Sequence, residues 1–295
     1  MFGHEEVLIF EAARPNLLGL AYRILGSLAD AEDAVQDTFL KWEKADRGDI
    51  KNMASWLTTV CTRRCLDLLR SAHRTRVTYV GEWLPEPVHT LVEHEAEDRL
   101  QLASSLTTAF MLMLERLTPK ERAAYLLHEI FDMSYLEVAG TLDIQENACR
   151  KLVSRAKANI DQTKVRHTAS VERQNQLLAA FQEAVTGGET TQLSSLLSKD
   201  IQLCADGGGK VPAVLNVLRG EAEVVTFLSE GLKEYWADHH WVSVGINATR
   251  GIVLQNQGAT VAAVSFAYDE DGLATNIYIV RNPDKLAQLG TITIQ

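Results

Sequence analysis

Hydrophobic residues in the first 75 positions recur at the three- and four-residue spacing of an amphipathic helix. A first helix can start at Pro15, and Gly26-Ser27 ends it. A second helix is predicted over residues 29–45, and Asn52 then caps a long third helix. The pattern therefore predicts an all-helical domain over residues 1–75.

The pattern changes in residues 76–94, which form a separate linker segment. A continuous helix is excluded there because Pro85 and Pro87 fall within three residues of each other. Trp83 and Leu84 are nevertheless too apolar for a free linker. We expect this segment to be extended and docked on another part of the chain.

Residues 95–166 are predicted to be helical again, and their second half has the pattern of a helix-turn-helix. Thr118-Pro119-Lys120-Glu121 and Ser134-Tyr135-Leu136-Glu137 are capping boxes, each of which marks a helix start. Leu142-Asp143-Ile144 lies where the motif needs a tight turn, and Gln145-Glu146-Asn147 opens the last helix.

This last helix is basic and predicts DNA binding. Its first turns carry a glutamate, an asparagine, an arginine and a lysine that can contact cytosine, adenine and guanine edges in the major groove. Its later bases fit phosphates, which position a protein without specifying sequence. A salt-bridged surface helix is the alternative, but only one acid opposes these bases. The candidate contacts are Glu146, Asn147, Arg150, Lys151, Arg155 and Lys157.

The last part of the chain, residues 171–295, has the pattern of an α+β domain with a curved antiparallel sheet. Its predicted helices are Val171–Val185, Thr191–Leu197 and Gly220–Tyr235, and its predicted strands are Ile201–Ala205, Trp241–Ala248, Gly251–Gln255, Thr260–Tyr268 and Ala274–Arg281. The glycine-rich turn Asp206–Lys210 lacks P-loop spacing. It is better explained as a tight connection in which Asp206 and Lys210 fix an interdomain contact.

Composition adds a constraint on partners. The net charge of the 295 residues is −10, but arginines cluster in the third helix and in the last helix of the helix-turn-helix. Local basic patches on an acidic chain are compatible with DNA. The chain shows no signal peptide and no membrane span, which favours the cytoplasm. Cys61 and Cys65 are expected in the helical core, and we predict neither a metal nor a cofactor.

An acidic segment in the predicted second helix resembles a known family. Asp33, Gln36 and Asp37 share one exposed face, which by itself fits a solvated helix surface. The segment DAEDAVQDTFLKW, followed by Ser55-Trp56-Leu57 and the run from Cys65 to Arg70, resembles region 2 of sigma-70 factors, closest to the extracytoplasmic function (ECF) group. The helix-turn-helix resembles region 4 of the same factors.

The resemblance implies partners and roles. Asp33, Gln36 and Asp37 would face the β′ clamp helices of core RNA polymerase. The third helix would engage and melt the promoter −10 element, and the helix-turn-helix would bind the −35 element. Thr62 and Arg63 depart from the Arg-Asn pair of many relatives, which leaves open the residue on the melted strand. Trp56 is either a stacking wedge or a core residue. The candidate −10 contacts are Asn52, Trp56, Arg63, Arg64, Arg70 and Arg74.

Three further segments resemble the SigJ-like ECF subgroup, whose members carry a C-terminal SnoaL-like domain. They are the linker from Tyr79 to Pro87, the glycine-rich turn with its following residues, and Asn282–Leu286. The resemblance implies that the extension tunes activity in place of a separate anti-sigma protein. The interdomain candidates are Trp83, Leu84, Pro85, Asp206, Gly207, Gly208, Gly209, Lys210, Asn282, Pro283 and Lys285.

Two other classes of function stay open at this point. A ligand-responsive helix-turn-helix regulator would use the C-terminal domain to bind a small molecule, which the sequence does not identify. An enzyme of the SnoaL type would use His239 or His240, of which only one can face a cavity because neighbours on a strand point to opposite faces. The acidic face of the second helix favours the sigma factor, because a repressor has no need of it.

Overall fold

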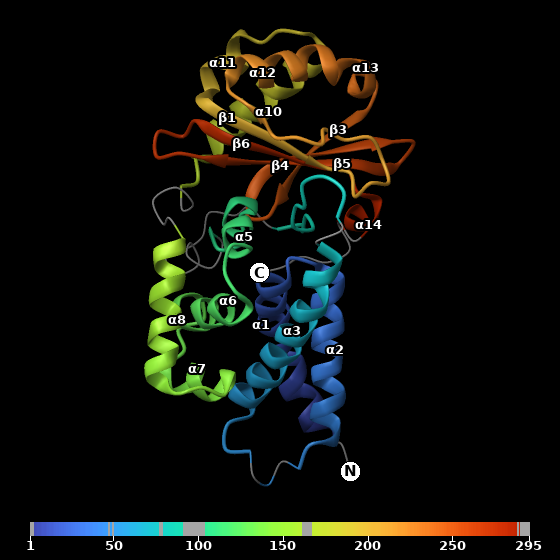
Figure 1. The fold of residues 1–295 in the computed structure, drawn as a ribbon. Helices are drawn as coiled ribbons and strands as arrows, with labels where there is room; N and C mark the ends of the chain where they lie inside the picture. Colours follow the sequence, from blue (N-terminus) through green and yellow to red (C-terminus); the bar gives the residue numbers. More distant parts are fainter. Residues whose placement is uncertain are drawn as a thin grey trace. The chain divides into compact units, whose positions relative to one another are not determined.

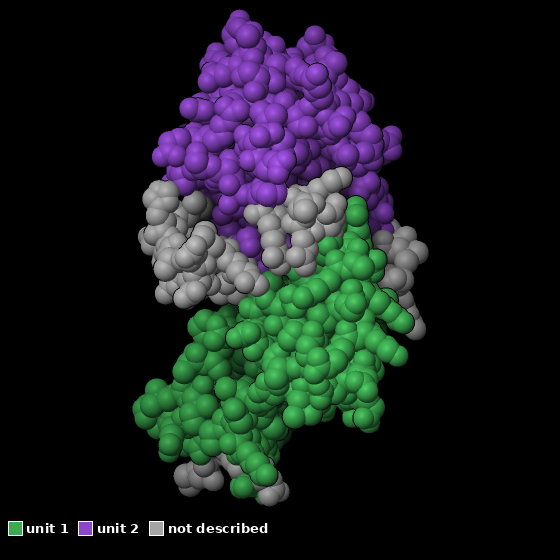
Figure 2. Space-filling model, turned by 90° about the vertical axis from the view of Figure 1, so that its left-hand side faces the viewer, with its two compact units in different colours: residues 1–77, 113–161, 294–295 green, residues 78–112, 162–293 purple. Residues whose placement is uncertain are grey.

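The computed structural model describes residues 3–46, 48, 50–76, 79–90, 104–160, 167–287 and 289, without the side chains of residues 72–76. The chain divides into two compact units (Figure 2). Unit 1 contains the described residues within 1–77 and 113–161, and unit 2 those within 78–112 and 162–293. The predicted linker therefore groups with the C-terminal domain, and so do residues 104–112, which we had expected in the second helical domain.

The named elements of unit 1 are all helices (Figure 1). Three long helices pack together and form the core of the predicted first domain. A second group of shorter helices ends in the helix-turn-helix, and both predicted capping boxes are present. The elements are α1 His4–Leu25, α2 Leu28–Lys44, α3 Met53–Arg76, α6 Pro119–Tyr125, η1 Leu126–Ile130, α7 Tyr135–Leu142 and α8 Glu146–Asn159.

The prediction that Pro15 starts the first helix is wrong, because α1 begins at His4 and contains Pro15 in its interior. Tertiary contacts hold the helix on the N-terminal side of the proline. The Phe10 ring packs edge-on against Phe39 of α2 at 4.9 Å, and the Trp42 indole donates to the Glu6 carbonyl at 3.0 Å. These contacts offset the loss of one helical hydrogen bond at the exposed proline.

Unit 2 contains a six-stranded sheet in the order β2-β1-β6-β5-β4-β3. The strands β3 to β6 form an antiparallel meander, but β1 pairs with β6 in parallel. The sheet is therefore mixed, and the expectation of a purely antiparallel sheet is wrong. The sequence pattern could not reveal this, because apolar residues alternate in the same way in parallel and antiparallel strands. The parallel pair β1 and β6 is joined by a long segment and not by a hairpin. The strands are β1 Leu197–Asp206, β2 Leu218–Arg219, β3 His240–Ile246, β4 Thr249–Asn256, β5 Ala259–Tyr268 and β6 Ala274–Val280.

The two faces of this sheet are covered by different segments of the chain (Figure 1). Along β6, Ile277 and Ile279 belong to the core under the helices, whereas Tyr278 and Val280 belong to a second core that includes Leu84 of the linker. The helices of unit 2 are α5 Thr108–Leu114, whose last two residues fall in unit 1, α10 Val171–Thr186, α11 Thr191–Leu196, α12 Glu221–Thr226, η2 Phe227–Gly231, α13 Lys233–Trp236 and α14 Pro283–Leu286. The sequence therefore places the linker where it completes a hydrophobic core.

Candidate nucleic-acid interface and linker contact

The linker docks on unit 2 through one buried carboxylate. Asp206, at the end of β1, is completely buried. One of its oxygens accepts hydrogen bonds from the Tyr79 hydroxyl at 2.6 Å and the Gly208 N–H at 3.0 Å. The other accepts from the Leu84 N–H at 2.9 Å and from the Lys285 ammonium at 2.7 Å. Four donors around one carboxylate satisfy a charge that would otherwise be costly to bury.

Lys285 connects the same site to the linker by two further contacts. Its ammonium also donates to the Leu84 carbonyl and lies 4.4 Å from the centre of the Trp83 ring. Such a cation over an aromatic face adds attraction where water is partly excluded. Leu84 and Pro85 are buried, while Trp83 is half-buried. The apolar residues that argued against a free linker are thus the ones that the site holds.

The glycine-rich turn lets the backbone approach Asn282. Gly208 and Gly209 both adopt the left-handed conformation, with φ angles of 62° and 70°. A Cβ on Gly208 would overlap the Asn282 amide, which donates to the Tyr79 hydroxyl at 2.9 Å. At the turn's end, Lys210 forms an exposed ion pair with Asp284. The turn is therefore a structural connection, and its lysine is engaged with a carboxylate.

Sequence reasoning missed two residues of this contact. The Tyr79 hydroxyl bonds both Asp206 and Asn282, and burial, with the Asp206 hydrogen bond second, raises its pKa above the ordinary value. Asn247, in the turn between β3 and β4, exchanges hydrogen bonds with the backbone of Val88. A polar aromatic at the linker's start and an asparagine with φ of 49° were the available signals.

The predicted acidic face lies on α2, and two of its three residues are exposed. Asp33 and Gln36 are exposed, whereas Asp37 is half-buried and pairs with Arg64 of α3 at 2.6 Å. The packing of Ala34 and Val35 into the core turns this face outward. Asp33 and Gln36 are therefore the residues of the set with the most accessible side chains.

The predicted −10 residues on and before α3 lie in different environments. Asn52 accepts from the Ser55 N–H at 3.0 Å and so caps the helix as predicted. Trp56 is half-buried against Trp42, with ring centres 5.6 Å apart. Thr62 is buried, so only Arg63 of that pair lies at the surface. The Arg70 guanidinium pairs with Asp67 at 2.9 Å. The Arg74 side chain lies outside the described part of the chain.

Arg63 connects α3 to the helix-turn-helix within unit 1. Its Nε donates to the Thr141 carbonyl at 2.9 Å and its Nη2 to the Gly140 carbonyl at 3.0 Å, at the C-terminal end of α7. The hydroxyls of Thr59 and Thr141 lie 3.0 Å apart. A cation on the last carbonyls of a helix is favourable because these groups lack partners within the helix.

The basic helix α8 presents its predicted DNA contacts to solvent. Asn147, Lys151 and the later bases are exposed, and Cys149, Val153 and Ala156 form the buried face. The preceding turn is set by Asp143, the C-cap of α7, with φ of 53°. The whole recognition set on this helix is Glu146, Asn147, Arg150, Lys151, Arg155 and Lys157, with Glu146 half-buried.

Two of these bases are paired in the described structure. Arg150 bonds Glu146 at 2.6 Å and stacks 4.3 Å from the centre of the Tyr135 ring. Lys157 pairs with Glu129 at 2.8 Å, and this hydrogen bond is the main cause that raises its pKa. Glu146 is therefore not the only acid that opposes the basic helix, which corrects the sequence prediction.

Of the remaining candidates, the cysteines of α3 are buried, as predicted. His240 is exposed in β3 and His239 is half-buried just before this strand. None of the described helices has the length and apolar character needed to cross a membrane.

Family models match two helical stretches of the chain. Residues 9–75 match sigma-70 region 2, and residues 107–160 match sigma-70 region 4. The ECF RNA polymerase sigma factor SigJ of Mycobacterium tuberculosis is 38% identical over 234 residues, which are 78% of this chain and 74% of that protein. The chain belongs to the ECF sigma factors.

Two more comparisons support this membership. The probable ECF RNA polymerase sigma factor SigI of M. tuberculosis is 32% identical over 194 residues, 65% of this chain and 67% of that protein. The crystal structure of M. tuberculosis SigJ matches with a TM-score of 0.73 and 32% identity, covering 96% of this chain and 99% of that one. The likeness therefore extends over the C-terminal α+β domain, and the predicted fold class of helical sigma domains plus a curved-sheet domain is confirmed.

Proposed function

We propose that this ECF sigma factor binds core RNA polymerase through the exposed face of α2 and promoter DNA through α3 and α8. The main support is that unit 1 carries both surfaces: the exposed Asp33 and Gln36 on α2, and the exposed basic face of the recognition helix α8. The acidic face fits a basic partner, and the basic helix fits the major groove. We propose that this work takes place in the bacterial cytoplasm, where promoters and polymerase meet.

Charge reversal on α2 tests the polymerase contact. Asp33→Lys combined with Gln36→Lys changes only exposed side chains, whereas Asp37→Lys would also place a lysine beside Arg64. Binding of the full chain to immobilised core polymerase should fall at least tenfold in the double variant. Glu270→Lys, an exposed acid in the β5–β6 turn of unit 2, is the matched control and should bind normally. Equal binding by the double variant and the control would refute this face.

Substitutions on α8 separate sequence readout from phosphate binding. Asn147→Ala should change base preference at one promoter position and cost about 1–3 kcal/mol there. Arg155→Ala should weaken binding to every sequence alike. It should also lower the slope of the logarithm of the binding constant against the logarithm of salt concentration by about 1, the value for one phosphate contact. If both variants weakened all sequences alike, α8 would not be the element that specifies the promoter.

We further propose that the described arrangement of unit 1 is a resting state for promoter melting. Arg63 is a candidate −10 contact, yet its guanidinium is occupied by the carbonyls at the end of α7. The guanidinium becomes available to a melted strand only when α7 leaves α3. The Arg64–Asp37 pair likewise joins a candidate DNA contact to a candidate polymerase contact.

We also propose that unit 2 acts by holding the linker and not by catalysis. Leu84 is part of the second core of the sheet. Asp206 accepts two of its four hydrogen bonds from the linker, and Lys285 donates one to the Leu84 carbonyl. Held in this way, the linker would restrict the two DNA-binding regions that it joins. Amide exchange of residues 79–90 in the full chain, free and bound to core polymerase, tests this role. Unchanged protection of the linker through polymerase binding and initiation would contradict it.

A further inference from the structure

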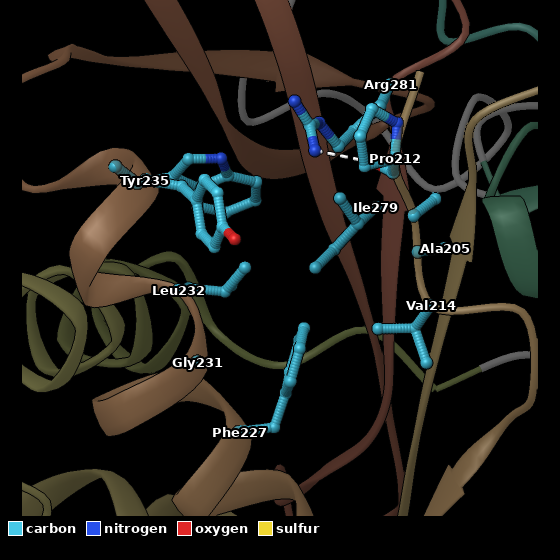
Figure 3. A pocket seen from close by; sticks show the side chains of 11 residues that line it. Ala205, Pro212, Val214, Phe227, Gly231, Leu232, Tyr235, Ile279 and Arg281 are labelled. Atoms are coloured by element: carbon cyan, nitrogen blue, oxygen red, sulfur yellow. Dashed lines mark hydrogen bonds between the residues drawn. The ribbon is translucent and has the colours of Figure 1, made fainter. Parts of the chain in front are cut away.

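Unit 2 contains a cavity of about 250 Å³ between the sheet and the helical segments η2 and α13 (Figure 3). Apolar side chains form most of its wall, and Arg281 and Tyr235 lie toward one end. Small-molecule sites in proteins are typically concave and mostly apolar with a few polar groups, which is the character of this cavity. Its apolar wall includes Val214, Phe227, Leu232, Trp236 and Ile279.

The helical wall of this cavity is built around a glycine. The predicted continuous helix over residues 220–235 is interrupted by the wide turn η2, which ends at Gly231. A Cβ on Gly231 would lie 2.9 Å from the Phe227 ring, closer than normal contact allows. The ring can therefore lie against the backbone, where it forms part of the cavity wall. Wide helical turns of this kind are frequent at functional sites.

Among the residues that the structure describes, Arg281 is the one cation that lines the cavity. Its Nη1 donates to the Pro212 carbonyl at 2.6 Å, a bond drawn in Figure 3. Its Nε is buried and has no hydrogen-bond partner among the described residues. Burial lowers the pKa of this guanidinium from its ordinary value. An unpaired buried donor is costly, and a carboxylate that accepts two parallel bonds from a guanidinium edge would satisfy it.

We propose that this cavity binds a small organic acid whose apolar body, aromatic or branched, contacts the wall and whose carboxylate pairs with Arg281. The cavity is below the range of about 300–1,000 Å³ that drug-sized ligands occupy, which selects a smaller molecule. The single cation at an otherwise apolar wall selects one negative charge. The chemistry excludes neutral polar molecules such as sugars, because the wall offers them few partners.

The acid site adjoins the linker contact along the backbone. Arg281 precedes Asn282, and the N–H groups of both residues donate to the Asp206 carbonyl, at 2.7 and 2.9 Å. Pro212 closely follows the glycine-rich turn on the other side. Binding of the acid does not require the regulatory role proposed above, and a binding assay tests it without polymerase.

The test uses 4-phenylbutyrate and its neutral counterpart 4-phenylbutanol as probes for the full chain in isothermal titration calorimetry. Phenylbutyrate should bind at one site, and Arg281→Gln should weaken it at least tenfold. Phenylbutanol should bind more weakly to the wild type and equally to both proteins, because it lacks the charge that Arg281 pairs with. A circular dichroism spectrum of each variant checks the fold.

A second variant tests the location without touching the charge. Val214→Trp should fill the cavity and abolish binding of both probes, whereas Leu215→Trp, at the neighbouring and exposed position, should leave binding unchanged. No saturable binding of phenylbutyrate by the wild type would overturn the proposal. Binding that survives Val214→Trp, or that Arg281→Gln does not weaken, would overturn it as well.

Discussion

Replacing Asp206 by asparagine should release the linker from unit 2. The substitution keeps the shape of the side chain but removes its charge and turns one of its two oxygens into a donor. Each oxygen now faces two donors, so either orientation of the amide places an N–H₂ group against two of them. Lys285 would also remain as a buried charge without its partner, since its side chain is 8% exposed.

The structure supplies an internal control for the magnitude. Breaking a buried ion pair from one side costs about 3–5 kcal/mol, whereas exposed pairs contribute about 0–1 kcal/mol. Asp284 and Lys210 form such an exposed pair in the same unit, with side chains 65% and 53% exposed. Asp206→Asn should therefore destabilise unit 2 by about 3–5 kcal/mol, and Asp284→Asn by less than about 1 kcal/mol.

Native-state hydrogen exchange is the suitable assay, because a chain of two units need not unfold in one transition. The amides of residues 79–90 should lose protection from exchange in Asp206→Asn. The amides of strands β1 and β6 should lose the share of their protection that comes from contact with the docked linker. The account is refuted if Asp206→Asn lowers protection no more than Asp284→Asn, or if the linker amides keep theirs.

Four further predictions test other contacts. Arg122→Met should destabilise unit 1 by about 1–3 kcal/mol in urea unfolding, because it leaves a carbonyl at the end of α1 without its buried donor, and a cost near zero would refute this. Ser134→Ala should cost about 0.5–2 kcal/mol through loss of the α7 cap, seen as faster exchange in that helix, whereas unchanged exchange would count against the cap. Oxidation of a Thr59→Cys/Thr141→Cys variant should fix α7 on α3 and silence transcription until a reductant is added; full activity of the crosslinked form would contradict the resting state. Because the pKa of Tyr79 is raised, docking of the linker should be complete below about pH 10 and weaken above it. In an absorbance titration of tyrosine ionisation, Tyr79→Phe should remove part of the last phase at high pH. An unchanged last phase would show that the Tyr79 hydroxyl is not held.

Local signals were sufficient for most helices and strands. Both capping boxes and the turn at Asp143 could be predicted because side chains within four residues determine them. Pro15 could not be placed correctly, since contacts with Phe39 and Trp42 of another helix decide that α1 continues through it. The parallel pairing of β1 with β6 was equally hidden, because it depends on which distant strands meet.

The linker contact was predictable in position but not in chemistry. Apolar residues beside two prolines indicated docking, and the resemblance grouped the linker, the glycine-rich turn and Asn282–Leu286 as interdomain candidates. What the sequence could not show is that Asp206 is fully buried and collects four donors, since burial of a carboxylate follows from the whole unit. The occupied state of Arg63 was hidden for the same reason, because its acceptors are backbone carbonyls of a distant helix.

Run-off transcription from a fragmented bacterial genome tests directly whether this chain initiates transcription at promoters through the exposed face of α2. Active core RNA polymerase would be supplied with the full chain or with the Asp33→Lys/Gln36→Lys variant. With the wild type, transcripts should begin at a defined set of promoters, and with the variant they should be lost. Absence of promoter-specific transcripts with the wild type, or equal transcription by the variant, would contradict the proposal.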